Sequence, residues 1–165
     1  LMFQPNDLTI ANNGVIFASD PDWKNSKGQL WRIETDGSSS LVEKDMGTTN
    51  GVEISPDQTK LYVNESAQRR VWVYELDKNL NASNKTLLIQ FPDFGLDGMR
   101  SDANGNLYIA RYGKGVVAKV SPDGKLLKEY KLKGEFPTNV TFSQKDPSLL
   151  YVTMQKRGAV ELLKL

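Results

Sequence analysis

The chain has 165 residues, of which 39% are hydrophobic and 25% charged, with a net charge of +1. No apolar run approaches the ~20 residues of a membrane helix, and Lys and Arg are scattered along the chain, which argues against a membrane or nucleic-acid partner. Cysteine and histidine are both absent, so thiol chemistry and the commonest metal ligand and general base are excluded. The composition agrees with a soluble all-β domain, and we expect any chemistry to come from carboxylates, amides and a hard, oxygen-preferring metal.

One pattern occurs four times along the chain. Each copy opens with a polar residue and a short apolar run, then passes through a turn into a second strand with an aliphatic or aromatic core. The four copies open at Asn6, Asn50, Asp97 and Thr138. A strand-rich repeat of roughly 40–50 residues is typical of β-propeller blades. We therefore predict an all-β propeller of about four four-stranded antiparallel blades, spanning approximately residues 6–46, 47–92, 93–134 and 135–165.

In the first unit, strands are predicted at Val15–Ser19 and Leu30–Glu34. They flank Asp20–Gly28, whose Asp, Pro, Asn, Ser and Gly residues predict a loop over one face of the propeller. In later units, Asn104-Gly105 and Asp123-Gly124 are typical of tight turns between paired strands. Three large aromatic residues are predicted to pack between blades rather than to stack on a ligand: Trp31, Trp72 and Tyr151.

The fourth unit ends one strand short of a complete blade, and only five residues precede Asn6. We therefore expect the chain to be the C-terminal part of a longer propeller, whose N-terminal blades would come from a fragment that is missing here. The alternative is that two copies close on each other, because open sheet edges promote aggregation unless they are covered.

Four segments resemble one protein family. The run Thr49–Asp57, followed by Lys60–Val63, is similar to the "PNG…SPDG..LYV" signature of the gluconolactonase, senescence-marker and luciferin-regenerating-enzyme-like family. Further matches occur in the same order around Pro5–Leu8, Leu96–Gly98 and Pro137–Phe142. Members of that family are six-bladed propellers that hydrolyse lactones, or in related branches organophosphates, at a divalent metal on the central axis. This chain resembles their last four blades.

The resemblance implies roles for individual residues. Asn50 matches a metal ligand, and Asp97 matches a metal ligand that is also the candidate catalytic base or nucleophile. Asn6 matches a residue that binds the metal or the substrate, while Asp20 and Trp23 are candidates for the wall of the substrate pocket. Equivalent positions on innermost strands converge on the propeller axis, and amide and carboxylate oxygens suit calcium, with magnesium, manganese or zinc as alternatives. Taken singly, each Asn or Asp is more typical of a turn residue that bonds its local backbone, whereas their repeat-equivalent positions together favour a site.

Two departures from the family pattern affect the functional prediction. The family's additional Glu ligand has no counterpart here, and Gln4 stands where some members have an Arg. We expect a metal-dependent hydrolase acting on a small-molecule lactone, with the 165-residue chain alone binding metal weakly and showing little activity. The alternatives are a non-enzymatic binding or scaffold propeller and an organophosphate-hydrolysing relative.

Overall fold

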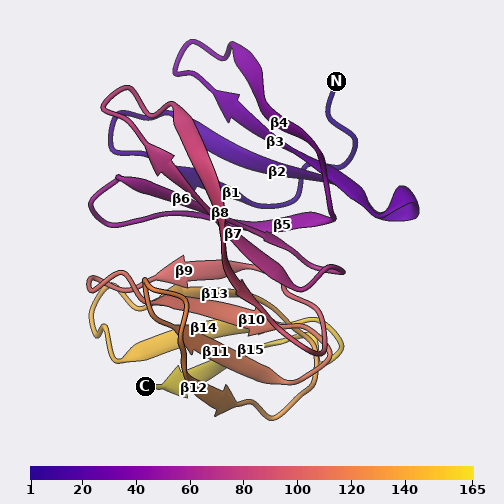
Figure 1. The fold of residues 1–165 in the computed structure, drawn as a ribbon. Coiled ribbons are helices and arrows are strands. Elements are labelled where there is room, and N and C mark those ends of the chain that lie inside the picture. Colours follow the sequence, from indigo (N-terminus) through magenta and orange to yellow (C-terminus); the bar gives the residue numbers. More distant parts are fainter.

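The computed structural model describes residues 1–165 and contains four antiparallel sheets (Figure 1). The first contains β1 (Leu8–Ile10), β2 (Ile16–Asp22), β3 (Lys27–Ile33) and β4 (Ser39–Met46). The second contains β5 (Thr49–Ile54), β6 (Lys60–Glu65), β7 (Arg70–Leu76) and β8 (Ala82–Gln90). The third contains β9 (Met99–Ser101), β10 (Leu107–Arg111), β11 (Val116–Val120) and β12 (Leu126–Lys131). The fourth contains β13 (Pro137–Phe142), β14 (Leu149–Met154) and β15 (Ala159–Lys164).

Each sheet is an up-and-down meander in which hydrogen-bonded neighbours follow one another in sequence. The chain passes from the innermost strand to the outermost and then crosses to the innermost strand of the next sheet. Inner strands of successive sheets are in contact, β1 and β2 with β5, β5 with β9, and β9 and β10 with β13. This arrangement confirms the predicted all-β propeller. The only helical segment is one 3-10 turn, η1 (Trp23–Asn25), and the structure has no helix with the length and hydropathy of a membrane span.

The core lies between the blades, in three hydrophobic clusters that each join two adjacent sheets. Phe17 and Leu61 are fully buried between the first two sheets, and Leu107 and Ile109 between the second and third. Every residue of β5 and of β10 is buried, because these strands have a neighbouring sheet on both faces. Burying one such aliphatic or aromatic side chain stabilises the fold by about 1.5–3 kcal/mol, so the contact between blades supplies most of the stability.

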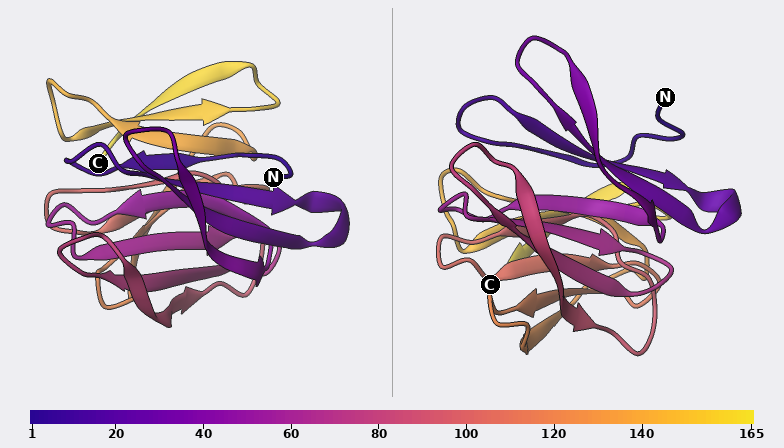
Figure 2. Two further views of the ribbon diagram at one scale, coloured as in Figure 1. Left: turned by 90° about the horizontal axis from the view of Figure 1, so that it is seen from above. Right: turned by 45° about the horizontal axis from the view of Figure 1, so that its top comes forward.

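The prediction of a loop at Asp20–Gly28 is wrong for most of these residues. Asp20, Pro21 and Asp22 continue β2 and pair with Gln29, Gly28 and Lys27 of β3. Pro21 is tolerated there because β1 pairs with β2 only as far as Ala18, so no ladder bond is lost at the proline nitrogen. The hairpin tip around η1 therefore projects beyond the ends of the other strands (Figures 1 and 2).

The predicted inter-blade position of Tyr151 is also wrong. Tyr151 is 41% exposed, and Val160 and Leu162 of β15 are 62% and 56% exposed. These side chains lie on the last sheet, which has no neighbour beyond it in this structure. Trp31 and Trp72 are half-buried, and Trp72 packs against the cluster between the first two sheets.

The second strand of each of the first three sheets carries, at or near its end, a buried charged residue that holds the segment entering that blade. The Asp20 carboxylate accepts hydrogen bonds from the backbone N–H groups of Phe3 (2.8 Å) and Gln4 (2.7 Å). The Glu65 carboxylate accepts one from the backbone N–H of Gly47 at 2.8 Å. In the third sheet the charge is reversed, and the Arg111 guanidinium donates to the carbonyl and the carboxylate of Asp93. Glu65 and Arg111 therefore fix the crossings into the second and third sheets, and Asp20 fixes the N-terminal segment.

Candidate functional site

The starts of the four innermost strands converge on one hollow of about 280 Å³. Asn6, Asn50, Asp97 and Thr138 all line it. Each of them lies two residues before a residue of the first strand that pairs with the second strand of its sheet. The four equivalent pairs are Leu8–Ala18, Val52–Val63, Met99–Ile109 and Val140–Val152. The structure thus brings together the repeat-equivalent residues of all four units. The hollow opens at the end of the sheets where β1, β5, β9 and β13 begin, which we call the site end.

Asn50 lines this hollow and carries a side-chain oxygen without a partner. Asn50 is 3% exposed, and its Oδ1 is buried without any hydrogen-bond partner. Leaving a buried amide oxygen unpaired costs about 1–3 kcal/mol, so such an atom is expected to meet a ligand or an ordered water.

Asp97 has the most perturbed carboxyl group of the site. Burial raises its pKa from 3.8 to about 7, against the opposing effects of a hydrogen bond from the Gly98 N–H (3.0 Å) and of the neighbouring Asn50 side chain. The negative charge of Asp7 raises the pKa further. A carboxyl group with a pKa near neutrality can both accept and return a proton at physiological pH.

Contacts from its own blade and from the preceding blade hold Asp97 in place. Its N–H donates to the carbonyl of Ala110 at 2.9 Å, and its own carbonyl accepts from Asn64 Nδ2 at 2.6 Å. Gly51 is required at this junction, because an added Cβ would lie 2.6 Å from both Asn64 Nδ2 and the Asp97 carbonyl oxygen. The site residue is therefore fixed by the second and third sheets together.

A second polar layer lies further along the innermost strands. The Asp7 carboxylate accepts from the backbone N–H of Val52 at 3.2 Å, and the Glu53 carboxylate accepts from that of Ser101 at 2.9 Å. Arg100 Nη1 lies 3.5 Å from Asp7 Oδ2 and 3.9 Å from Glu53 Oε2. Burial raises the pKa of Glu53, although its bonds to Ser101 oppose this. This layer joins the first three sheets beneath the hollow.

Three further residues line the hollow that sequence reasoning missed: Ser66, Tyr112 and Gln155. They occupy equivalent positions, each three residues after the second-strand residue of the pairs given above. The repeat that aligned the first strands could therefore have located them too. The Tyr112 hydroxyl donates to Gln155 Oε1 at 2.6 Å and so sets the orientation of the Gln155 amide.

The two candidates for the pocket wall have different positions. Trp23 lines the hollow and is 43% exposed at the hairpin tip. Asp20 is fully buried and does not line it, because its carboxylate binds the N-terminal segment and accepts a further hydrogen bond from the Trp31 indole at 3.3 Å. Asp20 therefore does not line the hollow as we expected, and its carboxylate anchors the N-terminal segment instead.

The donor set of the hollow fits an oxygen-preferring cation. The structure has no cluster of three Asp, Glu, His or Cys side chains that could hold a metal ion, and Asp97 is the one acidic residue among those that line the hollow. The unpaired Asn50 Oδ1 and the Asp97 carboxylate are hard oxygen donors, and Asn6 adds a third candidate. Such a set suits calcium or magnesium, although a single carboxylate predicts weak binding.

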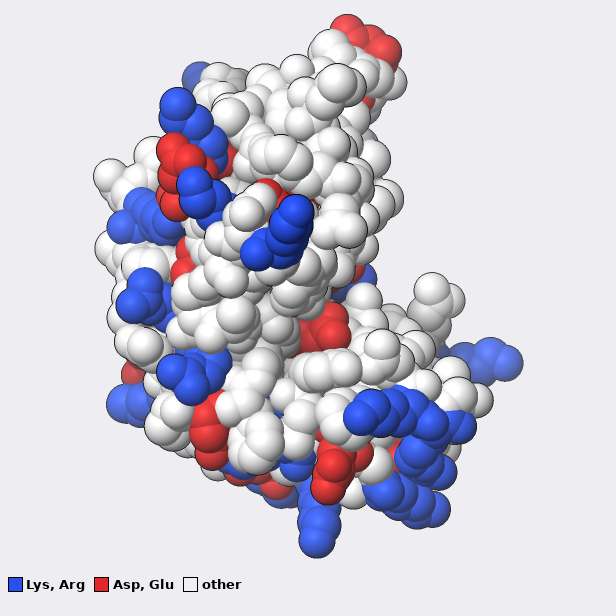
Figure 3. Space-filling model, turned by 90° about the vertical axis from the view of Figure 1, so that its right-hand side faces the viewer, with Lys and Arg blue, Asp and Glu red and all other residues white.

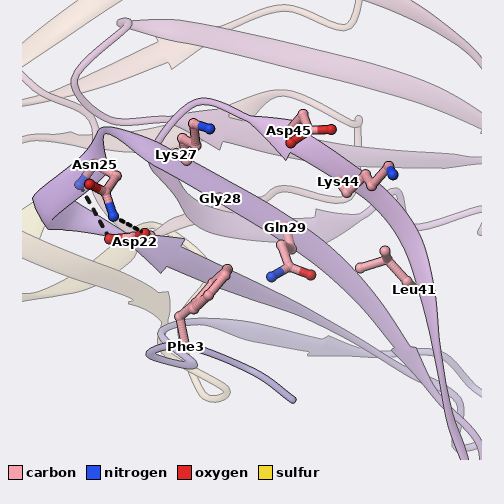
Figure 4. Close-up of a pocket in the computed structure, with 9 residues that line it drawn as sticks. All are labelled: Phe3, Asp22, Asn25, Lys27, Gly28, Gln29, Leu41, Lys44 and Asp45. Carbon is pink, nitrogen blue, oxygen red and sulfur yellow. Dashed lines mark hydrogen bonds between the residues drawn. The ribbon is translucent and has the colours of Figure 1, made fainter.

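A larger hollow, of about 490 Å³, lies beside the first blade (Figure 4). It is lined by side chains of the N-terminal segment, the β2–β3 hairpin and β4, among them Phe3, Gln29 and Leu41. Asp22 is bonded there to Asn25, through Oδ2 and the side-chain amide at 2.6 Å. None of the four repeat-equivalent residues reaches this hollow, and none of the buried polar atoms without a partner belongs to its lining.

Comparison with known proteins shows the family to which the chain belongs. Residues 2–156 match the sequence profile described as "SMP-30/Gluconolactonase/LRE-like region". The chain belongs to this family. It is 35% identical over 145 residues to a gluconolactonase of Zymomonas mobilis, covering 74% of this chain and 40% of the relative. It is 32% identical over 151 residues to the pentonolactonase XacC of Haloferax volcanii, covering 90% of this chain and 52% of the relative.

A solved structure of this family has the same architecture. Regucalcin from Agrobacterium tumefaciens, described as a calcium-binding protein, matches with a TM-score of 0.82 and 26% identity, covering 90% of this chain and 52% of that chain. The chain therefore spans about half the length of these relatives.

Proposed function

We propose that this chain carries the hydrolytic site of a metal-dependent lactonase of the gluconolactonase type. One observation supports the proposal above the others. A carboxyl group with a pKa of about 7 lies beside an amide oxygen that is buried and unpaired, in a hollow where the first strands of all four blades meet. A scaffold propeller has no need for either feature.

In the proposed reaction, Asp97 accepts a proton from a water molecule as the water oxygen attacks the lactone carbonyl carbon. The ring C–O bond then breaks, and Asp97 returns the proton to the departing ring oxygen, which leaves an open hydroxy acid. The contacts of the Asp97 main chain with Ala110 and Asn64 hold the carboxyl group in position during both transfers. Asn6 and Trp23 are proposed to contact the substrate.

Asn50 and Asp97, with Asn6, are proposed to hold a divalent ion, calcium first and magnesium, manganese or zinc as alternatives. A bound ion of this kind polarises an ester carbonyl and lowers the pKa of a nearby water. The donor set supports this proposal through the unpaired Asn50 Oδ1. With one carboxylate, we expect binding of calcium to the 165-residue chain in the millimolar range or weaker.

Hydrolysis of glucono-1,5-lactone tests the proposed function. Because metal binding is expected to be weak, the assay uses a high concentration of the chain and millimolar calcium. We expect slow turnover above the spontaneous rate, which a chelator abolishes. Asp97→Asn should lower the rate by about 100-fold or more, as expected for loss of a general base.

Asp57→Asn is the matched control. Asp57 lies in the exposed turn between β5 and β6, where its carboxylate bonds Ser55 and Thr59 far from the hollow. Its variant should keep the full rate. Equal rates for the wild type and Asp97→Asn would overturn the proposed role of Asp97. Hydrolysis of an organophosphate in place of the lactone would assign the site to the alternative branch.

A further inference from the structure

Two residues on the wall of the hollow are bonded to each other. Tyr112 and Gln155 both line the hollow, and the Tyr112 hydroxyl donates to Gln155 Oε1 at 2.6 Å. A glutamine amide has one oxygen acceptor and two N–H donors. Because Tyr112 holds the oxygen, the free end of the amide is the Nε2 group, which has no hydrogen-bond partner in the protein. This wall of the hollow therefore offers N–H donors that no protein group uses.

The Gln155 amide is held in place before any ligand arrives. The main-chain N–H of Gln155 donates to the carbonyl of Phe136 at 3.0 Å, and its carbonyl accepts from the N–H of Gly158 at 3.2 Å. The Tyr112 ring, whose hydroxyl holds the amide oxygen, meets the Phe136 ring edge-on with their centres 5.1 Å apart. A glutamine side chain ordinarily loses rotamer freedom when it binds a ligand. These contacts already restrict it, so less freedom is lost on binding.

This wall stands next to the proposed general base. The main-chain N–H of Asp97 donates to the carbonyl of Ala110 at 2.9 Å, and that of Gly95 donates to the carbonyl of Tyr112 at 3.0 Å. These two bonds pair the segment that leaves β10 with the segment that enters β9. Asp97 and Tyr112 both line the hollow, so the amide that Tyr112 holds belongs to the part of the wall beside Asp97.

We infer that Gln155 binds the carbonyl oxygen of the lactone through its Nε2–H groups, and that Tyr112 positions the amide for this contact. The inference rests on the proposed function, since it assigns a further residue of the same site. A carbonyl oxygen only accepts hydrogen bonds, whereas a sugar hydroxyl both donates and accepts, so an amide that presents its N–H groups favours the carbonyl.

The same contact would act during the reaction. When the water oxygen attacks, the carbonyl oxygen takes up negative charge, and this charge returns to the carbon as the ring C–O bond breaks. An N–H donor that is already in position stabilises that charge without rearrangement. The carbonyl oxygen has two lone pairs, so it can contact Gln155 and the proposed cation together.

Binding of two unreactive ring compounds tests the inference without requiring turnover. Glucono-1,5-lactam carries the ring carbonyl, and 1,5-anhydroglucitol has a methylene group in its place. NMR titration of the isotope-labelled 165-residue chain, with a chelator present, gives the affinity for each compound. We expect the lactam to bind about threefold to tenfold more tightly, the range that one neutral hydrogen bond gives. The side-chain N–H signals of Gln155 should shift with the lactam and stay in place with 1,5-anhydroglucitol.

Substitutions separate the donor groups from the shape of the wall. Gln155→Met and Gln155→Glu keep the length of the side chain and remove both N–H donors, so each variant should bind the two compounds alike. Tyr112→Phe keeps the ring but releases the amide, so it should reduce the preference. Gln144→Met is the matched control, because Gln144 is an exposed glutamine in the turn between β13 and β14, at the opposite end of the same blade. It should keep the full preference.

Several results would overturn the inference. They are equal affinities of the wild type for the two compounds, a preference that survives in Gln155→Met, an equal loss in Gln144→Met, and Gln155 signals that do not shift with the lactam. A preference that appears only after calcium is added would also overturn it, because the cation and not Gln155 would then bind the carbonyl.

Activity separates this inference from the proposed function. If the chain prefers the lactam through Gln155 but does not hydrolyse glucono-1,5-lactone, the proposed function fails and the carbonyl contact stands. If the wild type and Gln155→Met hydrolyse the lactone at equal kcat and both bind the two ring compounds alike, the proposed function stands and the carbonyl contact fails.

Discussion

At the scale of single residues, two features of the surroundings of Asp97 disfavour the ionised form of its carboxyl group. Its carboxyl group is largely withdrawn from water, and Asp7 adds a nearby negative charge. Two contacts oppose these effects, the Gly98 N–H and the Asn50 side chain, and they are too weak to restore the ordinary pKa. The protein without a bound cation therefore holds an acid that resists ionisation.

The stability of the cation-free protein should depend on this group. An acid whose folded pKa is raised stabilises the fold fully below its unfolded pKa of 3.8, and this contribution is lost as the pH rises through about 7. The full shift corresponds to about 4 kcal/mol, which partial solvent exposure reduces to about 2 kcal/mol. In the presence of a chelator, we expect Asp97→Asn to unfold in more urea than the wild type at pH 8 and in nearly the same urea at pH 4.

The same titrations can contradict this account. If Asp97→Asn is less stable than the wild type at pH 8, the ionised carboxylate must have a stabilising partner in the fold. Added calcium supplies an internal control, because it should stabilise the wild type and leave the variant unchanged.

Asp20 illustrates a buried carboxylate whose position is explained by structure alone. It accepts hydrogen bonds from two backbone N–H groups and from the Trp31 indole, and it is fully buried. We expect Asp20→Asn to lower the free energy of unfolding by about 2–3 kcal/mol, because the amide replaces one acceptor with a donor that faces N–H groups. Asp22→Asn, at the exposed hairpin tip, should cost under about 1 kcal/mol. If urea denaturation gives the same loss of unfolding free energy for both variants, the hydrogen bonds of Asp20 do not stabilise the fold more than those of an exposed aspartate.

At the scale of elements, the innermost strands begin where neighbouring blades are closest. In both Asn50-Gly51 and Asp97-Gly98, a glycine follows a site residue. Each glycine lies against an asparagine side chain from another strand, Asn64 for Gly51 and Asn139 for Gly98. A Cβ on Gly98 would lie 2.1 Å from Asn139 Oδ1. The glycines therefore permit the polar residues of adjacent sheets to meet at the axis.

A substitution at Gly51 should disturb both the fold and the site. In Gly51→Ala the new methyl group meets a backbone carbonyl, that of Asp97, which cannot move as a side-chain end can. We expect a loss of about 2–3 kcal/mol in the free energy of unfolding, typical of overpacking, together with loss of calcium binding.

Gly37→Ala gives the comparison. Gly37 has a φ of +84° in the turn between β3 and β4, and nothing lies within 4 Å of an added Cβ. That variant should cost only the left-handed backbone penalty of about 1 kcal/mol and keep calcium binding. If the two variants unfold alike, close packing at the axis is not the reason for Gly51.

At the scale of the whole molecule, the first and last sheets each have an apolar face without a neighbour. On β1, Leu8 is 47% and Ile10 60% exposed, while Thr9 between them is buried toward the second sheet. On β15, Val160 and Leu162 are similarly exposed. Because strand edges and apolar faces of this kind promote association, we propose that a further segment of the same protein or a second copy covers them.

Self-association in solution checks this proposal. We expect sedimentation velocity to show concentration-dependent association of the 165-residue chain, and Val160→Lys with Leu162→Lys to reduce it by placing charges on the uncovered face. Leu126→Lys with Leu127→Lys is the control, since these β12 residues are as exposed but belong to the third sheet. A monomer at all concentrations, or an equal effect of the control, would contradict it.

The sequence by itself determined the architecture and the first ring of the site. Alternating apolar residues and tight turns are local features, and their fourfold recurrence is enough to place Asn6, Asn50, Asp97 and Thr138 at equivalent positions. The family resemblance rests on those same segments. Local periodicity suffices here because each blade is a meander whose neighbours in space are neighbours in sequence.

Only the tertiary structure decided what each polar group meets. It placed Asp20 against the N-terminal segment, left Asn50 Oδ1 without a partner, and raised the pKa of Asp97. It also brought Lys and Arg side chains that are scattered in the sequence together along the lower right of one face (Figure 3). The burial, the hydrogen-bond partners and the electrostatic surroundings of a polar group depend on which strand ends face one another across the axis. Residues some 45 positions apart in the chain carry no local signal of that proximity.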